Sequence, residues 1–207
     1  MSLRYAKQND LARIAEIYTQ AFPGSVSFYY GPGSDARVQK LLIPSFTTLM
    51  KSGARVLLYG DPAVGYCCYT DNDSQTNRKL FSLSSLKNYL QALIKGNLVI
   101  KPSEISKLIH SQLQMKRHYD VDLPPIRGRI MSIALLPSEQ SHGIGKVLLD
   151  QALLEIGNQH VVLEVRPENE KAYRLYKSAG FSLRGSTRDL LGCWLIMIKD
   201  PIKNSSE

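Results

Sequence analysis

An apolar strand that runs directly into a glycine-bearing helix start constrains this chain more than any other part of its sequence. The segment is Ile133-Ala-Leu-Leu-Pro-Ser-Glu-Gln-Ser-His-Gly-Ile-Gly-Lys146, and the helix that it opens continues to Gly157. The first turn of a helix leaves backbone N–H groups without partners and carries a partial positive charge. Glycines let that backbone approach a ligand closely. The segment therefore predicts a site for phosphate.

Two common phosphate-binding loops do not fit this segment. A Walker A loop requires Ser or Thr after its Lys, and Val147 follows Lys146 here. A dinucleotide-binding fingerprint requires a third small residue where Leu148 stands. From these residues alone, an ordinary helix start that carries two glycines stays an alternative.

The spacing of apolar residues predicts alternating strands and helices along most of the chain. In the second half the pattern is strand, helix, strand, helix and two strands, over 129–136, 143–157, 161–165, 169–179, 181–185 and 190–198. In the first half it is a strand, two helices and a hairpin, over 3–6, 11–22, from 35, and 55–59 with 64–69. Pro23-Gly24 ends the first helix, and residues 71–79 are typical of a polar loop. This order predicts a mixed α/β sheet with helices on both faces.

A basic segment, about 74–126, separates the two halves. It holds eight Lys and Arg against three Asp and Glu, which is +5 of the chain's net charge of +8. Amphipathic helical patterns occupy 83–95 and 103–119, and we interpret the segment as a helical insertion into one domain covering 1–207. Three uses are open: a lid that attracts an anionic acceptor, a docking face for acidic lipid or protein, or a solvated elaboration.

Composition excludes several classes of protein. No apolar run approaches the ~18 residues that span a bilayer, so we expect no membrane span. Three cysteines, two of them adjacent, make no disulfide framework and favour the cytoplasm. His110 and His118 have no cysteine or carboxylate at ligand spacing, so we expect no metal. The basic residues are not interleaved with aromatic ones, so we expect no nucleic-acid partner.

A second motif follows the first by about 25 residues, in Leu163-Glu-Val-Arg-Pro-Glu-Asn-Glu-Lys-Ala-Tyr-Arg-Leu-Tyr-Lys-Ser-Ala-Gly-Phe181. Together the two motifs resemble the GNAT superfamily of acyl-CoA N-acyltransferases. The matching residues are Leu135-Leu-Pro137, Gln140-Ser-His-Gly143-Ile-Gly145, Asn169, Ala172, Tyr176, Gly180 and Phe181. The sequence departs from the family pattern at Glu139, where an aromatic residue is common, and at Ser141, where glycine is common. The resemblance covers most of the chain outside 74–126 and implies a central mixed, splayed sheet flanked by helices.

The resemblance implies acetyl-CoA as the co-substrate. Its pyrophosphate would be held by backbone N–H groups of Gln140, Ser141, His142, Gly143, Ile144, Gly145 and Lys146. Its pantetheine arm would lie along the strand end formed by Ile133, Ala134 and Leu135. Asn169 would line the cofactor side.

Acetyl transfer to an amine needs a neutral nitrogen, a donor for the oxyanion and a proton for the departing thiolate. The second motif implies that Tyr176 is the general acid; a tyrosine of the helical core is the alternative, because an apolar stripe includes it. Glu164 lies on a strand that looks like the one bearing the base in ribosomal-protein N-terminal acetyltransferases. It either faces the acceptor cleft as the base or forms a surface pair near Arg166.

The sequence thus predicts a cytoplasmic, acetyl-CoA-dependent N-acetyltransferase. Its acceptor would be a small-molecule or peptide amine, with an anionic acceptor as one option, and a homodimer is one assembly that the sequence allows. A non-catalytic acyl-CoA-binding or regulatory member of the same fold is the alternative.

Overall fold

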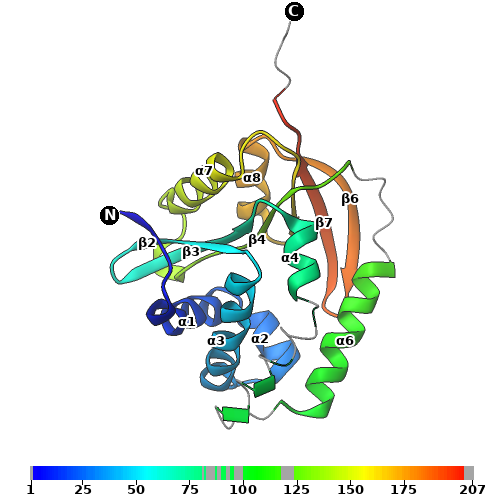
Figure 1. The fold of residues 1–207 in the computed structure, drawn as a ribbon. Coiled ribbons are helices and arrows are strands. Elements are labelled where there is room, and N and C mark those ends of the chain that lie inside the picture. The colour runs from blue at the N-terminus through cyan, green and yellow to red at the C-terminus, as the bar shows by residue number, and fades with distance from the viewer. Residues whose placement is uncertain are drawn as a thin grey trace, which may run out of the picture.

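The computed structural model describes residues 2–80, 82, 87, 90, 91, 94, 95, 100–117 and 124–202. These residues form a seven-stranded sheet in the order β1-β2-β3-β4-β5-β7-β6 (Figure 1). The strands are β1 (Leu3–Tyr5), β2 (Arg55–Gly60), β3 (Ala63–Thr70), β4 (Gly128–Leu135), β5 (Val161–Val165), β6 (Ser182–Asp189) and β7 (Gly192–Lys199). The helices are α1 (Leu11–Ala21), α2 (Pro23–Tyr30), α3 (Asp35–Lys51), α4 (Asp73–Leu80), α6 (Pro102–Arg117), α7 (Ile144–Ile156) and α8 (Glu170–Ser178), with 3-10 turns η1 (Gln8–Asp10) and η2 (Pro137–Glu139).

Helices cover both faces of the sheet, as the alternating pattern predicts. On one face α1 contacts β3 and β4 and packs against α3; on the other, α7 contacts β2, β3 and β4. Side chains alternate across a strand, and along β3 Tyr66 and Cys68 belong to the core beneath α1, whereas Cys67 and Tyr69 belong to the core beneath α7. All four are buried. The predicted mixed α/β fold is confirmed.

The sheet opens in its middle. β4 and β5 are its parallel pair, and they are joined at only two positions, Gly128 with Val161 and Arg129 with Val162. Beyond these pairs β4 continues to Leu135 and β5 to Val165 without pairing to each other. The register between β3 and β4 also shifts, leaving Met131 as an extra residue in β4. Such a bulge bends and twists its strand, so the predicted splayed sheet is confirmed.

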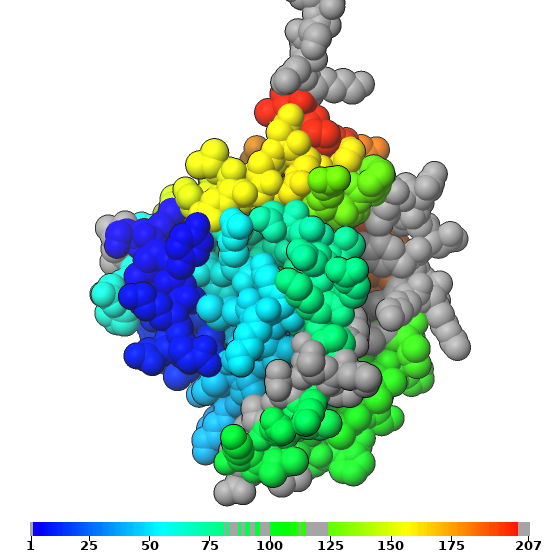
Figure 2. Space-filling view, in the orientation of Figure 1, coloured from blue at the N-terminus to red at the C-terminus, as the bar shows by residue number. Residues whose placement is uncertain are grey.

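Two helices occur where the sequence predicts none. The first helix ends before Pro23 as expected, but Pro23 is also the first residue of α2, a position where proline loses no hydrogen bond. The polar loop expected over 71–79 is wrong, because α4 occupies Asp73–Leu80. Asp73 and Thr76 are buried on this helix, and it lies beside the end of α3 (Figure 2). Because its inward-facing side chains are polar, the sequence of this helix shows no apolar residues at helical spacing.

The basic segment contributes α4 and α6. The helix predicted over 103–119 is confirmed as α6, whereas the one predicted over 83–95 lies largely outside the described residues. α6 turns Glu104 and Ser111 inward, while Ile105, Ile109 and Leu113 are 43%, 56% and 51% exposed. An ion pair explains this orientation, because Arg37 of α3 donates two hydrogen bonds to Glu104, at 2.9 and 2.6 Å. No helix within the described ranges is long and apolar enough to cross a membrane.

Candidate functional site

A cavity of about 820 Å³ occupies the space between the separated ends of β4 and β5. The two strands supply the residues from Ile130 to Ile133 and from Leu163 to Val165, and Arg166 follows directly after β5. The other walls come from α1, α2, α6, α8 and the β6–β7 hairpin. They include Tyr18, Phe22, Tyr29, Leu108, Ser111, Glu168, Asn169, Tyr176, Asp189 and Trp194. The opening of the sheet and the cavity are therefore one feature.

Tyr176 reaches this cavity from the buried side of α8. Its ring packs edge-on against Phe181, with centroids 6.0 Å apart, and the residue is 8% exposed. The main-chain and side-chain groups of the described residues form no hydrogen bond with its hydroxyl. Burial raises the pKa of Tyr176 well above its ordinary value, so the phenol keeps its proton at neutral pH. The residue is both part of the core and part of the cavity wall.

Glu164 lines the cavity at the point where the strands separate. Its two carboxylate oxygens accept hydrogen bonds of 2.6 and 2.8 Å from one guanidinium nitrogen of Arg129. The same guanidinium donates to Asp73 of α4, at 2.8 and 3.3 Å. Burial alone would lower the pKa of Arg129, but the two carboxylates outweigh it and raise that pKa. Glu164 therefore faces the cleft and is ion-paired as well, with a partner that the sequence did not identify.

The glycine loop after β4 presents free amide groups. Ser141 and Gly143 have φ values of 69° and 80°, in the left-handed region that turns successive N–H groups toward one side. Gly143 caps α7, and its carbonyl accepts the first helical hydrogen bonds from Lys146 and Val147. The backbone N–H groups of 141–145 make no hydrogen bond to a described residue. These donors suit the oxygens of a phosphate group.

A lysine from the second motif stands beside this loop. Lys171, in the first turn of α8, donates a hydrogen bond of 3.2 Å to the Ser141 hydroxyl. Lys146 instead pairs with Asp150 one turn along α7. A Cβ at Gly145 would lie 3.4 Å from the Leu175 side chain, which is an ordinary van der Waals contact. The sequence analysis did not identify Lys171 as a charge beside the loop. Its position two residues after the motif residue Asn169, at the start of the second helix, was the available signal.

The strand end predicted for the pantetheine arm has one free edge. Ile133, Ala134 and Leu135 pair with β3 on one side, and no β5 residue pairs with them on the other. Asn169 has a structural role as well as a place on the cavity wall. Its side-chain oxygen accepts a hydrogen bond of 3.2 Å from Ala172 N and caps α8. The assigned roles of these four residues stay predictions.

A polar network, which the sequence analysis missed, lines part of the cavity wall. Arg166 donates two hydrogen bonds to Asp189, at 2.9 and 2.8 Å, and lies 3.8 Å from the centre of the Trp194 ring. The Tyr29 hydroxyl lies 2.6 Å from that of Ser111 and donates to Asp189 at 3.1 Å. Burial opposes the charge on Asp189, but Trp194 and Arg166 outweigh it and lower the pKa of the carboxyl. The network joins α2, α6, β5 and the β6–β7 hairpin.

Residues 111–181 match the model of the Acetyltransferase (GNAT) family. This range contains the strand edge, the amide loop, Glu164 and Tyr176. The whole fold agrees with it. A crystal structure of histone acetyltransferase HPA2 and related acetyltransferase from Corynebacterium glutamicum superposes with a TM-score of 0.64, at 17% identity, over 99% of this chain and 98% of that one. Residues 111–181 are thus similar to the GNAT family, and the whole chain has the fold of such acetyltransferases.

Other proteins are similar to this chain in fold or in part of the sequence. The structure of yncA from Salmonella typhimurium with its cofactor acetyl-CoA has a TM-score of 0.56, at 16% identity, over 100% of this chain and 97% of that one. N-alpha-acetyltransferase RimI from Mycobacterium tuberculosis is 38% identical over 65 residues, 31% of this chain and 41% of that protein. An uncharacterized protein from Mycobacterium leprae is 39% identical over 62 residues, 30% of this chain and 17% of that one. The chain thus matches less than half of either curated relative.

Replacing Gly143 tests whether the amide loop binds acetyl-CoA. An alanine in the left-handed conformation costs about 1–2 kcal/mol, so Gly143→Ala should weaken acetyl-CoA binding roughly tenfold, as measured by isothermal titration calorimetry. Gly157→Ala is the matched control, because Gly157 has a φ of 84° at the other end of α7 and also has open space around its Cβ position. Equal affinity losses in the two variants would contradict a binding role for the loop.

Proposed function

We propose that this protein transfers the acetyl group of acetyl-CoA to a primary amine by direct attack of the amine, with Tyr176 as general acid and Glu164 as base. One observation carries the proposal. The strand that ends in an unpaired amide loop also borders a cavity that contains a buried phenol and a carboxylate. Donor recognition and proton transfer are thus available in the same opening of the sheet.

Several groups of this chain fit acetyl-CoA. The N–H groups of 141–145 are hydrogen-bond donors without a partner among the described residues, and Lys171 adds a positive charge beside them. The free edge of Ile133–Leu135 offers backbone groups to an extended chain such as pantetheine. When bound, acetyl-CoA supplies a thioester as the acetyl donor. The loop would hold the phosphates, and the strand edge would direct the rest of the molecule toward the cavity.

Tyr176 would supply the proton that the leaving thiolate needs. A general acid must still hold its proton when the reaction begins, and burial keeps this phenol protonated by raising its pKa. Its hydroxyl is free of hydrogen bonds to the described residues, so the proton is available. A backbone N–H group near Leu135, where the strands separate, would donate to the oxygen that gains negative charge.

Glu164 would receive the proton of the attacking amine. An alkylammonium group has a pKa of about 10, so it is mostly protonated at neutral pH and must lose a proton before it attacks. The carboxylate faces the cavity, and Arg129 fixes its position through two hydrogen bonds. An intervening water would complete the path from the amine.

The acceptor is proposed at the level of a primary amine. Similarity to RimI within the motif region supports an α-amino group of a peptide, and the cavity volume also suits a small amine. Cys67, Cys68 and Cys193 are free thiols, which fits the cytoplasm as the proposed compartment.

An acceptor screen tests the proposal. Purified protein is titrated with acetyl-CoA by calorimetry, and release of free CoA thiol is then followed with peptides, amino sugars, lysine derivatives and small alkyl amines. We expect saturable acetyl-CoA binding and thiol release that depends on at least one amine class. Tight binding without amine-dependent release across the panel would instead favour a non-catalytic acyl-CoA-binding member of the superfamily.

A further inference from the structure

The charge of the cavity is opposite to that of the chain. The chain has a net charge of +8, yet among the described residues the charged ones that line the cavity are three carboxylates, Glu164, Glu168 and Asp189, and one cation, Arg166. No described lysine lines it. A cavity walled by one sign of charge concentrates molecules of the other sign. This cavity therefore favours positively charged molecules.

Arg166, the one cation among the described lining residues, already has partners. Arg166 makes two hydrogen bonds to Asp189 and a third, of 3.2 Å, to the Cys193 carbonyl, and its guanidinium stacks on Trp194. An anionic acceptor would have to displace these contacts to reach the guanidinium. The Arg166 guanidinium is therefore not available to bind a carboxylate or phosphate of an acceptor.

One carboxylate of the cavity wall differs from the other two. Glu164 is ion-paired with Arg129, and Asp189 is ion-paired with Arg166. Glu168, in the segment between β5 and α8, is exposed, lines the cavity, and has no ion pair or hydrogen bond with the described residues. It offers a free carboxylate to a ligand that occupies the cavity.

Aromatic residues add to this preference. Tyr18, Phe22 and Tyr29 line the cavity, and the faces of aromatic rings attract cations. The amide loop lies outside the lining of the cavity and has the opposite character, because the N–H groups of 141–145 have no partner among the described residues and Lys171 lies beside them. An anionic donor and a cationic acceptor would therefore be attracted to different places.

From these contacts we infer that the acceptor carries a positive charge besides the amine that is acetylated, and that Glu168 recognises this charge. The inference rests on the proposed function, because it names the acceptor class of the same cavity. An amine with a second ammonium or guanidinium group fits it, whereas an amine with a carboxylate or phosphate does not.

Three amines of equal length test the inference: 1,5-diaminopentane, 5-aminopentan-1-ol and 5-aminopentanoate. Each has a primary amine at one end, and the other end is a second ammonium group, a hydroxyl or a carboxylate, which is positive, neutral or negative. We expect kcat/KM to fall in that order, by roughly tenfold at each step, since one favourable or unfavourable charge interaction in a partly enclosed site has about this effect. Binding of the same three amines to protein saturated with CoA should follow the same order by calorimetry.

The second arm replaces Glu168 with glutamine. Glu168→Gln should raise the KM for the diamine about fivefold, with kcat, the KM of the amino alcohol and the affinity for acetyl-CoA nearly unchanged. Glu170→Gln is the matched control. It makes the same charge change two residues away, on an exposed side chain that pairs with Arg174 and lies outside the cavity lining. It should leave the order of the three amines intact.

The outcomes separate this inference from the proposed function. Charge-selective binding without acetylation of any amine would support the inference and overturn the proposed function. Acetylation of all three amines at equal rates, or fastest with the carboxylate, would support the proposed function and overturn the inference. An equal response to Glu168→Gln and Glu170→Gln would overturn the role of Glu168, because both variants would then act through net charge alone.

Discussion

Replacing Tyr176 with phenylalanine should lower kcat for acetyl transfer by roughly 100-fold or more, the usual contribution of a general acid. The affinity for acetyl-CoA should not change, because the variant removes one hydroxyl without altering the amide loop or the strand edge. The hydroxyl makes no hydrogen bond to the described residues, so the thermal stability should be close to that of the parent protein. Steady-state kinetics, calorimetric titration and thermal unfolding measure these three quantities.

Tyr173→Phe is the matched control for this prediction. Tyr173 lies on the same helix, at the edge of the core, and it does not line the cavity. We expect full activity from Tyr173→Phe. Activity of Tyr176→Phe within about threefold of the parent would contradict the acid role and leave Tyr176 as a packing residue alone.

Replacing Arg129 with methionine should reduce the free energy of unfolding by about 3–5 kcal/mol, the usual effect of removing one partner from a buried ion pair. The side chains of Arg129, Asp73 and Glu164 are 21%, 12% and 15% exposed. Without the guanidinium, both carboxylates would be left partly buried without compensation. For a chain of this size the loss corresponds to a drop of about 10 °C in Tm, which differential scanning calorimetry would detect.

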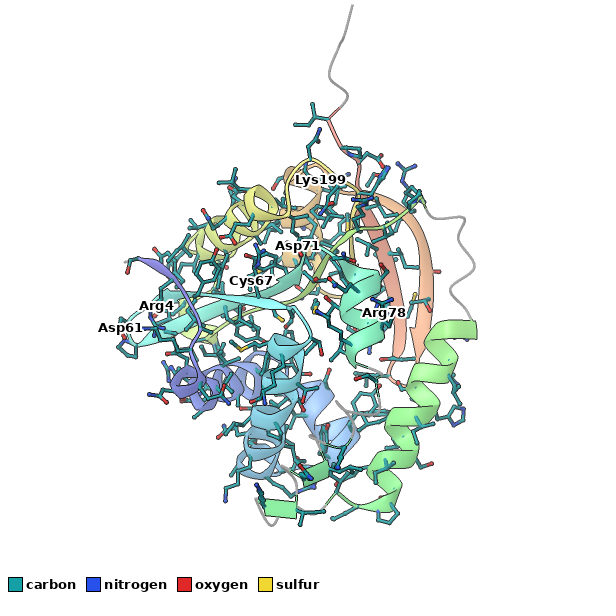
Figure 3. The ribbon with its side chains drawn as sticks, viewed as in Figure 1. Arg4, Asp61, Cys67, Asp71, Arg78 and Lys199 are labelled. Atoms are coloured by element: carbon teal, nitrogen blue, oxygen red, sulfur yellow. The ribbon has the colours of Figure 1, made fainter. Side chains whose placement is uncertain are left out.

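Arg4→Met is the control for this second prediction. Arg4 also makes two hydrogen bonds to one carboxylate, that of Asp10, at 2.8 and 2.7 Å. Its side chain is 33% exposed and lies near the β2–β3 turn, away from Cys67 in the middle of the sheet (Figure 3). We expect a loss below about 1 kcal/mol there. Adding Glu164→Gln to Arg129→Met should restore part of the stability, since it removes one uncompensated charge; a further loss would contradict the ion-pair explanation.

Local patterns in the sequence were sufficient to predict the strands and helices whose buried residues are apolar. β5 was predicted over 161–165 and has those bounds, and α7 differs by one residue at each end from the predicted 143–157. In both elements the buried residues repeat at the spacing of a strand or a helix, and that spacing can be read without knowledge of the rest of the fold. The splayed sheet followed from the resemblance of two motifs to a superfamily with that architecture.

Polar contacts between distant segments could not be read in the same way. Arg129 and Glu164 are 35 residues apart, and they meet only because β4 and β5 are parallel and in the register that pairs Arg129 with Val162. α4 buries Asp73 rather than an apolar stripe, so its sequence resembles that of a loop. The contacts of Tyr29 with Ser111 and Asp189 join residues 82 and 160 positions apart. Such pairs depend on topology and register, which leave no periodic trace.

The narrow seam between β4 and β5 has a consequence for how this scaffold can diversify. Only two residue pairs join β4 to β5. The width of the cavity is therefore set by the side chains that line it and not by backbone hydrogen bonds between the two strands. A substitution of a lining residue changes the shape of the cavity that a ligand meets without disrupting a strand. Substitutions in α2, α6 or the β6–β7 hairpin can therefore change the proposed acceptor, while the amide loop and the free edge of β4, which form the proposed donor site, stay unchanged.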